Sequence, residues 1–279
     1  MAIITLTSDI GLQDYLTGAI KGLLAQNCPD HRVIDISHEI LPFNFPQAAY
    51  LCKSALKWFP RKTCHFILVN LFDHKNTHYL LCEHQGQYFF SADNGLITMI
   101  LDGKPEVISR LEMPPVGNNT LAVISGFAEA VLALEYGTPV SEIGHPVDTL
   151  VERNPLQPIV QNTYIEGQVI YIDRFENVVV NITREQFEAS RKGRGFRISV
   201  MRDEFISQIS ESYADAPEGE KVAMFNTAGY LEIAINKGNA AGLFGLESYS
   251  KDAASYRSVK DNQFQKQLFY QTIRVHFED

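Results

Sequence analysis

The sequence predicts two domains, the first of the α/β class and the second built mainly of antiparallel β-strands. Three observations support this fold class: strand-like and helix-like segments alternate in the first half, hairpin signatures dominate the second half, and a stretch with two prolines lies between them. With 279 residues, the chain is longer than the roughly 100–200 residues of one ordinary domain, so both domains fit within it.

The first half carries strands buried on both faces, with helices between them. Continuous apolar runs bounded by turn residues indicate such strands, and apolar residues at helical spacing indicate helices that pack on a sheet. The pattern predicts strands at 3–7, 33–36, 66–69, 79–82 and 88–90 and helices at 15–24, 46–59 and 120–136. Strands that alternate with helices favour a mainly parallel sheet with helices on both faces.

A linker is expected at residues 153–158, where Pro155 and Pro158 prevent a helix or a sheet ladder from continuing. It separates a first domain at 1–152 from a second domain at 159–279. In the second domain, strand-like runs flank short polar turns, which is typical of β-hairpins. The paired strands are 167–172 with 178–182 and 222–225 with 230–235; a last strand is expected at 272–277, and the polar stretch 247–266 is expected to be the least structured.

Composition and charge exclude several classes of protein. Hydrophobic residues make up 45% of the chain and charged residues 20%, which is typical of a folded protein and not of a disordered or collagen-like one. The net charge of −9, with no basic patch, speaks against a nucleic-acid partner. No apolar stretch approaches the ~20 residues of a membrane helix, so we expect no membrane association.

The cysteines are equally informative. All four lie in mostly apolar segments and never in a CxxC spacing, so the sequence predicts neither a metal site nor a disulfide framework. A reducing cytoplasm is therefore the expected location. The common nucleotide-binding and hydrolase motifs do not occur in the chain.

Polar side chains follow several of the expected strands. Asp9 lies in the turn after the first strand, at the edge where open α/β sheets bind ligands. Its carboxylate can accept two hydrogen bonds from a vicinal diol such as a ribose, or it can simply cap the turn. His38 ends the second strand, close to Asp35, and can be a base or a hydrogen-bonded structural residue. Asp93 and Asn94 precede a glycine, a pattern that tight-turn chemistry alone explains.

A loop at 70–78 follows the third strand and places acidic, basic and cationic groups side by side. Asp73, His74 and His78 can form a proton-transfer cluster, although a charged loop of this kind can also be merely solvated. His74 and His78 are four residues apart, but nothing makes the stretch helical, so the spacing is a weak indication of a metal site.

Seven short segments, spread in order over nearly the whole chain, carry a resemblance to a known family. They are TSDIG at 7–11, DISH at 35–38, DNGL at 93–96, IDRFEN at 172–177, SYAD at 212–215, NTAGYLEIA at 226–234 and NKGNAA at 236–241. Together they resemble the S-adenosyl-L-methionine (SAM) hydroxide adenosyltransferases, relatives of the fluorinase and chlorinase enzymes. Each segment is weak alone, but their common order is specific.

The resemblance implies an α/β N-terminal domain and a β-barrel-like C-terminal domain. It further implies a homotrimer in which SAM, as substrate or ligand and without another cofactor, binds between the N-terminal domain of one subunit and the C-terminal domain of the next. By the same resemblance, Asp9 holds the ribose diol, and Phe175 and Tyr213 lie against the adenine, a flat π surface that aromatic rings bind well. The residues expected to hydrogen-bond the base or the amino-acid part are Asn177, Asn226 and Thr227, although the last two also suit a hairpin turn.

The chain departs from the family pattern at the catalytic positions. In members that hydrolyse SAM, an Asp, an Arg and a His are expected to orient and activate water. Here the corresponding positions hold Asn70, Thr77 and Ala122, none of which can take a proton or carry a charge. One positioned acid–base group typically contributes a factor of ~10²–10⁴ to the rate, so hydrolysis is expected to be weak or altered. The candidate catalytic residues are therefore those of the same loop: Asn70, Asp73, His74, Thr77 and His78.

Two further departures concern the bound amino-acid end. Ala228 stands where halogenating relatives have an arginine, and Glu176 replaces the glycine of the Phe-Gly-Asn turn. The leading expectation is a protein that converts SAM and water to adenosine and methionine, slowly or in altered form. The alternative is a sensor or sequestering protein that binds adenosine or SAM without turnover.

Overall fold

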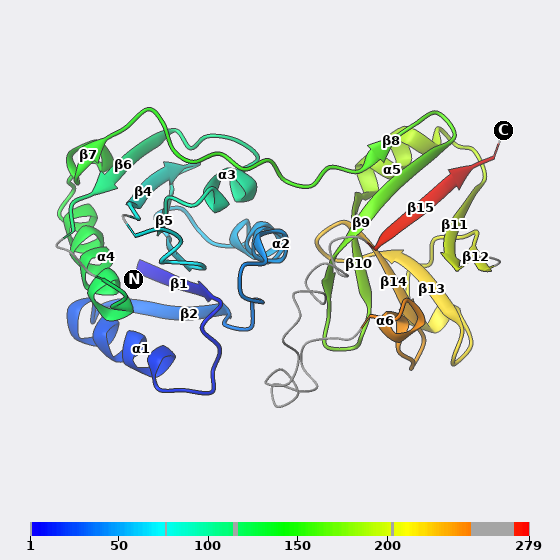
Figure 1. The fold of residues 1–279 in the computed structure, drawn as a ribbon, viewed down its shortest axis with the longest axis horizontal. Coiled ribbons are helices and arrows are strands. Elements are labelled where there is room, and N and C mark those ends of the chain that lie inside the picture. Colours follow the sequence, from blue (N-terminus) through cyan, green and yellow to red (C-terminus); the bar gives the residue numbers. More distant parts are fainter. Residues whose placement is uncertain (1, 76, 114–116, 202–203, 247–270, 279) are drawn as a thin grey trace. The chain divides into compact units, whose positions relative to one another are not determined.

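The structure, a computed structural model, describes residues 2–75, 77–113, 117–201, 204–246 and 271–278 (Figure 1). Contacts within the chain divide it into two compact units, Met1–Pro155 and Leu156–Asp279. This division falls inside the stretch 153–158, where the sequence predicts a linker. The stretch 247–266, expected to be the least structured, lies outside the described residues.

The first unit is a mixed sheet with helices on both faces (Figure 1). Its strands have the spatial order β2-β1-β3-β5-β4-β6-β7, so β2 and β7 are the edge strands. The elements are β1 (Ala2–Ser8), α1 (Leu16–Asn27), β2 (His31–Ser37), α2 (Phe45–Leu56), β3 (Cys64–Leu68), β4 (Tyr79–His84), β5 (Gln87–Ala92), α3 (Leu96–Leu101), β6 (Val107–Leu111), α4 (Thr120–Glu135), the 3-10 helix η1 (Val140–Glu142) and β7 (His145–Pro146).

One side of this sheet is parallel and the other antiparallel. Strands β2, β1, β3 and β5 pair in parallel, whereas β4, β6 and β7 pair antiparallel with their neighbours. The change occurs because a tight turn at Gln85 and Gly86, both with positive φ, joins β4 directly to β5 without a crossover helix. The predicted fold class is confirmed, and the parallel strands bring the carboxyl ends of β1, β2, β3 and β5 to one edge.

The helices cover the two faces of the sheet in pairs. Phe66 of β3 packs with the α1 and α4 side, where its ring lies 4.9 Å from that of Phe90 and 5.3 Å from that of Phe127. Ile67, the next residue along β3, packs on the opposite face with Cys52 of α2 and other α2 and α3 side chains. Successive residues of a strand point to opposite faces, so the continuous apolar run in β3 requires helices on both.

Helix ends in the first unit follow local sequence signals. The Asn44 side chain accepts a hydrogen bond from the Gln47 N–H and caps α2, whose first turn also holds Pro46. Asn119 caps α4 in the same way, by accepting from the Ala122 N–H. These caps place both helices close to their predicted bounds.

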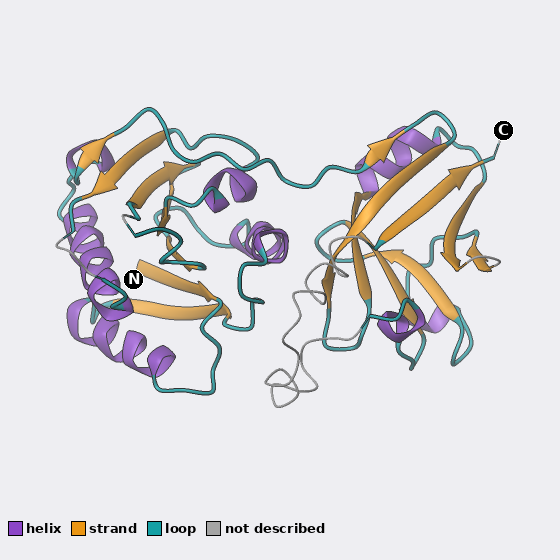
Figure 2. Cartoon of the chain, viewed as in Figure 1, coloured by secondary structure: helices purple, strands orange, loops and turns teal. Residues whose placement is uncertain are grey.

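The second unit is an antiparallel sheet that curls into a nearly closed barrel (Figure 2). The strand order β12-β11-β15-β9-β10-β14-β13 is joined by β8, which pairs with β9. The elements are β8 (Ile159–Val160), β9 (Tyr164–Ile172), β10 (Val178–Thr183), α5 (Arg184–Arg191), β11 (Phe196–Met201), β12 (Glu204–Ile206), the 3-10 helix η2 (Tyr213–Asp215), β13 (Lys221–Phe225), β14 (Tyr230–Ile235), α6 (Ala240–Leu243) and β15 (Thr272–Phe277).

Both predicted hairpins of the second unit are present. Strand β9 pairs antiparallel with β10 across the turn 173–177, and β13 pairs antiparallel with β14 across the turn 226–229. The interior is apolar, with the ring of Phe187 on α5 packed against those of Phe196 and Phe225. The two hairpins therefore present their turns on a rigid, separately packed core.

Among the described residues, none of the helices combines the length and the apolar character that crossing a bilayer would require. Within the same part of the chain, no group of three or more His, Cys, Asp or Glu side chains is arranged to hold a metal ion.

Candidate functional site

The predicted site residues fall into two groups, one in each unit. In the first unit they lie at the common carboxyl edge of the parallel strands: Asp9 follows β1, Asn70 follows β3, and the turn 93–95 follows β5. Open α/β sheets bind ligands at this edge because loops, helix N-termini and strand ends meet there. The order of the strands thus positions the first group.

Asp9 and Asn70 are joined directly. The Asn70 backbone N–H donates to Asp9 Oδ2 at 2.9 Å. Asn70 has a φ of +48°, in the left-handed region where Asn is among the few tolerated residue types. Burial raises the pKa of the half-buried Asp9 carboxyl, and the Asn70 N–H partly offsets that effect. The result is a fixed carboxylate in a partly dry position, suited to accept hydroxyl hydrogen bonds.

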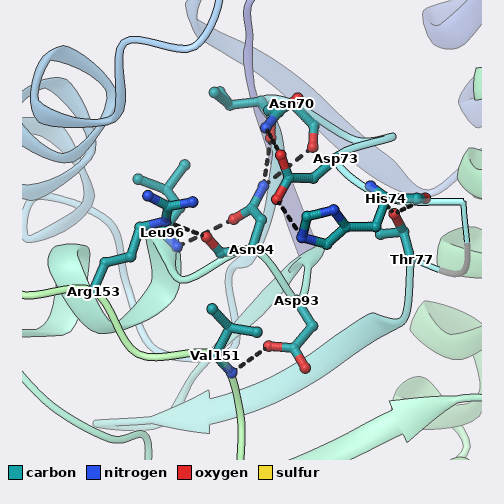
Figure 3. A network of polar contacts seen from close by, with 10 residues as sticks. Asn70, Asp73, His74, Thr77, Asp93, Asn94, Leu96, Val151 and Arg153 are labelled. Carbon is teal, nitrogen blue, oxygen red and sulfur yellow. Dashed lines mark hydrogen bonds and ion pairs between the residues drawn. The ribbon is translucent and has the colours of Figure 1, made fainter.

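Four predicted residues, Asn70, Asp73, His74 and Thr77, form a connected polar chain (Figure 3). The Asn70 side chain donates to Asp73 Oδ1 at 2.7 Å, and His74 Nε2 lies 3.2 Å from Asp73 Oδ2. Thr77 Oγ1 accepts from the His74 N–H at 3.0 Å and donates to the His74 carbonyl at 2.7 Å. His74 itself is 76% exposed, so it is a base in contact with solvent that is paired to a more protected carboxylate.

His78 lies apart from this chain of contacts. Its side chain is exposed, and its backbone carbonyl accepts from the Asp93 N–H at 2.8 Å. The structure therefore brings together Asn70, Asp73, His74 and Thr77, and uses His78 to tie the loop to the neighbouring turn.

The turn after β5 supports the loop from below (Figure 3). Asn94 is 1% exposed, and its side-chain amide donates to the carbonyls of Val69 at 3.0 Å and Asn70 at 3.2 Å. Its oxygen accepts from the Leu96 N–H at 3.1 Å. Sequence reasoning explained this segment as a turn and missed the long-range role of Asn94, for which a buried amide beside a glycine gives no distinct signal.

A second buried network holds the turn that carries Asp9. Ser8 Oγ lies 2.7 Å from His38 Nδ1, and His38 Nε2 lies 3.1 Å from Asp35 Oδ1. The Gly11 N–H donates to the His38 carbonyl at 2.8 Å. The residue types are those of a hydrolase relay, but Ser8 is fully buried and cannot meet a substrate. His38 is thus a structural support, one of the two alternatives that the sequence left open.

The predicted residues of the second unit also form one cluster. Asp173 Oδ1 accepts from the Phe175 and Asn177 N–H groups at 2.8 Å, and Asp173 Oδ2 accepts from the Asn177 side chain at 3.0 Å. The same Asn177 amide lies 3.4 Å from the Tyr213 hydroxyl, which donates to Glu232 Oε1 at 2.6 Å. The cluster therefore links a hairpin turn, the helix η2 and strand β14.

The carboxyl of Glu232 is the buried centre of this cluster. It is 5% exposed, and burial and the nearby Asp173 raise its pKa while hydrogen bonds from Tyr213 and Asn226 act in the opposite direction. Burial and Glu232 likewise raise the pKa of Tyr213, so its phenol stays a proton donor. Sequence reasoning did not select Glu232 or Asp173; the signal for Glu232 is a lone charged residue inside an apolar strand.

The remaining predicted residues lie at the surface of this cluster. Asn226 Oδ1 accepts from the Ala228 and Tyr230 N–H groups at 3.0 and 3.1 Å, which fixes the β13–β14 turn. Thr227 is exposed at the tip of that turn. Phe175 is 76% exposed, so its ring is accessible to solvent in the β9–β10 turn.

Two models of one protein family match this chain, one in each unit. Residues 4–144 match the SAM hydroxide adenosyltransferase N-terminal domain, and residues 167–251 match the C-terminal domain of the same family. An (R)-S-adenosyl-L-methionine hydrolase of Thermus thermophilus is 28% identical over 86% of this chain and 94% of its own length. A fluorinase of Nocardia brasiliensis is 25% identical over 88% of this chain and 94% of its own.

Solved structures show the same fold. An uncharacterized conserved protein from Thermotoga maritima superposes with a TM-score of 0.78 at 22% identity, covering 99% of this chain and 100% of its own. A conserved hypothetical protein from Thermus thermophilus has a TM-score of 0.70 at 24% identity, with full coverage of both chains. The matched domains, which together span most of the sequence, establish that this chain belongs to the SAM hydroxide adenosyltransferase family.

Proposed function

We propose that the chain binds SAM or adenosine and converts SAM and water to adenosine and methionine, slowly compared with relatives that hold the full catalytic set. The observation that carries this proposal is the fixed carboxylate of Asp9 at the carboxyl edge of β1, held by the Asn70 N–H at 2.9 Å. A ribose offers two vicinal hydroxyls, and a carboxylate can accept a hydrogen bond from each. The ligand is a small molecule and, given the charge of −9, not a nucleic acid.

The second unit is proposed to hold the base and the amino-acid part. Phe175 and Tyr213 supply aromatic surface for the adenine, and Asn177, Asn226 and Thr227 supply amide and hydroxyl groups. We further propose that the ligand lies between the first unit of one copy and the second unit of another, in a homotrimer that acts in the cytoplasm. The paired carboxylates Asp173 and Glu232 would make this part of the site favourable for a cation such as a sulfonium.

The reaction itself needs an activated water and little else. The water oxygen forms a bond to the 5′ carbon while the bond from that carbon to sulfur breaks, and the sulfur keeps the electron pair and becomes the neutral thioether of methionine. Because the sulfonium leaves without an acid, the only proton to move is that of the water. No metal or organic cofactor is needed for this step.

Proton acceptance is where this chain differs from its relatives. Asn70, Thr77 and Ala122 offer no base, so we propose the pair formed by Asp73 and His74 as the remaining acceptor. A single acid–base pair in contact with solvent accounts for slow turnover. The alternative, binding without turnover, rests on the same three positions and on the 76% exposure of His74.

Product analysis distinguishes the two functions. The purified chain is incubated with SAM, and adenosine and methionine are followed by chromatography; equal amounts of both are expected, with Asp73→Asn slowing their formation ~10²-fold. Asp30→Asn, which removes an exposed carboxylate of the same unit, serves as the matched control and should not change the rate. Binding without product would leave the sensor function, and absence of both would refute the proposal.

A further inference from the structure

The last residues of the first unit are bound to the turn 93–95 (Figure 3). The Val151 N–H donates to Asp93 Oδ1 at 2.8 Å, and Arg153 Nε donates to the Asn94 carbonyl at 2.7 Å. The Arg153 N–H donates to Thr98 Oγ1 at 2.9 Å, and that oxygen lies 3.0 Å from the Arg153 carbonyl. Segment 151–153 is therefore an integral part of the site-bearing edge.

Packing around Arg153 shows that the turn is shaped to receive it. Its guanidinium lies over the ring of Phe45, 4.4 Å from the centroid. Its stem lies against Gly95, where an added Cβ would come within 2.4 Å of Arg153 Cγ. Gly95 also has a φ of +89°, so two separate constraints require glycine at this position.

The turn 93–95 is connected to Asp9 through hydrogen bonds of Asn70. Asn94, whose carbonyl Arg153 holds, donates through its side chain to the carbonyl of Asn70 at 3.2 Å. The Asn70 N–H in turn donates to Asp9 Oδ2 at 2.9 Å. Asn70 has a φ of +48°, in the left-handed region that Asn tolerates better than most L-residues, and its carbonyl and N–H are both hydrogen-bonded there. The contacts from Arg153 through Asn94 therefore bear on the position of the Asn70 N–H.

We infer that Arg153 is a positioning residue for the Asp9 carboxylate, and that it thereby sets the preference of the site for ligands with a ribose diol. The inference rests on the proposed function, because the proposed function assigns the ribose diol to Asp9. Arg153 touches neither ligand nor Asp9 in this account; it acts through the Asn94 turn and the Asn70 N–H. Its removal should therefore weaken binding of a diol ligand and leave a ligand without the diol unaffected.

The test compares the affinities of the full chain for adenosine and for 2′,3′-dideoxyadenosine by calorimetry. The wild type should favour adenosine. Arg153→Ala should lose about tenfold in adenosine affinity, the effect of one weakened charge-assisted hydrogen bond, with dideoxyadenosine affinity unchanged. Arg153→Lys keeps a cation near Phe45 but loses the Nε donor, so it should lose diol preference too. Arg32→Ala removes an exposed arginine of the same unit and is the matched control.

Thr98→Val provides a second variant that keeps the arginine and removes the hydroxyl that binds its backbone. It should reduce the diol preference in the same direction. If both Arg153→Ala and Thr98→Val keep the wild-type preference while Asp9→Asn loses it, the inference is wrong and the proposed function stands. If the wild type and Asp9→Asn bind both nucleosides equally, the assignment of Asp9 fails, and the inference fails with it.

Discussion

The Tyr213 hydroxyl donates a hydrogen bond to Glu232 Oε1 at 2.6 Å, from the helix η2 to a buried position on β14. A tyrosine whose hydroxyl is held by a hydrogen bond has a fixed side-chain axis, so the direction in which the Tyr213 ring extends depends on a carboxyl that the ligand need not touch. The pKa of that carboxyl is raised by its burial. The second-unit cluster is therefore a place where protonation, stability and ring orientation are linked.

Replacing Glu232 with glutamine should change how stability depends on pH. A carboxyl whose pKa is raised on folding stabilises the folded state at low pH and loses that contribution as the pH rises from its unfolded pKa through its folded one. Glu232→Gln retains an acceptor for Tyr213 and removes the titration. Its free energy of unfolding, measured by urea denaturation from acidic to neutral pH, should rise relative to that of the wild type as the pH increases. A constant difference over this range would contradict the assignment.

Adenosine affinity should depend on the protonation of Asp9. Burial raises the pKa of this carboxyl above its ordinary value of 3.8, and only the carboxylate accepts from both hydroxyls of a diol. Affinity should therefore be constant at neutral pH and fall by about tenfold per pH unit below the raised pKa. Calorimetric titrations of the wild type and Asp9→Asn with adenosine, from neutral to acidic pH, check this dependence. An identical acid decline in Asp9→Asn would assign the titration to another group.

His65 should make the first unit sensitive to acid. Its ring is fully buried on β3, its Nδ1 lies 2.8 Å from Thr5 Oγ1, and burial lowers its pKa to about 4. A histidine with a lowered folded pKa stabilises the folded state above its unfolded pKa and loses that contribution as the pH falls toward the folded one.

The expected size of this effect is about 3 kcal/mol between pH 6.5 and pH 4. His65→Gln should be less stable than the wild type at pH 7 and should approach it at pH 4.5, as measured by urea denaturation at both values. Parallel curves for the two proteins would show that His65 does not titrate in this range.

The Ser8–His38–Asp35 network should be required for stability of the Asp9 turn. His38→Ala removes a buried ring and leaves the Ser8 hydroxyl and the Asp35 carboxylate without their shared partner, which should lower the free energy of unfolding by about 2–4 kcal/mol. His145→Ala is the control, because that side chain is 68% exposed and forms an ion pair with the exposed Glu112; its cost should stay within about 0.5 kcal/mol. Equal costs would contradict a supporting role for His38.

Much of the fold could be predicted because its signals are local. Apolar runs mark β1 and β3, and asparagine caps mark the starts of α2 and α4. All of these signals lie within the elements or directly beside them. The hairpin of β4 and β5 shows where local reading was incomplete: the sequence indicated two strands without their pairing, and the short turn at Gln85 and Gly86, both with positive φ, makes the pair antiparallel.

The site was harder to predict because its contacts are long-range. Asp9 and the loop 70–78 could be selected as strand-end polar residues, but the bond between them joins positions 61 residues apart. Asn94 and Arg153 act through backbone carbonyls, which any residue possesses, so no side-chain pattern marks them. The burial of Glu232 is explained by its hydrogen bond from Tyr213, a partner 19 residues away that the sequence does not reveal.

The most direct test of the account is a calorimetric titration of the full chain with SAM. We expect saturable binding that Asp9→Ala weakens at least ~10-fold and that Asp30→Asn leaves unchanged, because the proposed function assigns the ribose hydroxyls to the Asp9 carboxylate. Absence of binding by the wild type, or equal binding by Asp9→Ala, would contradict the account.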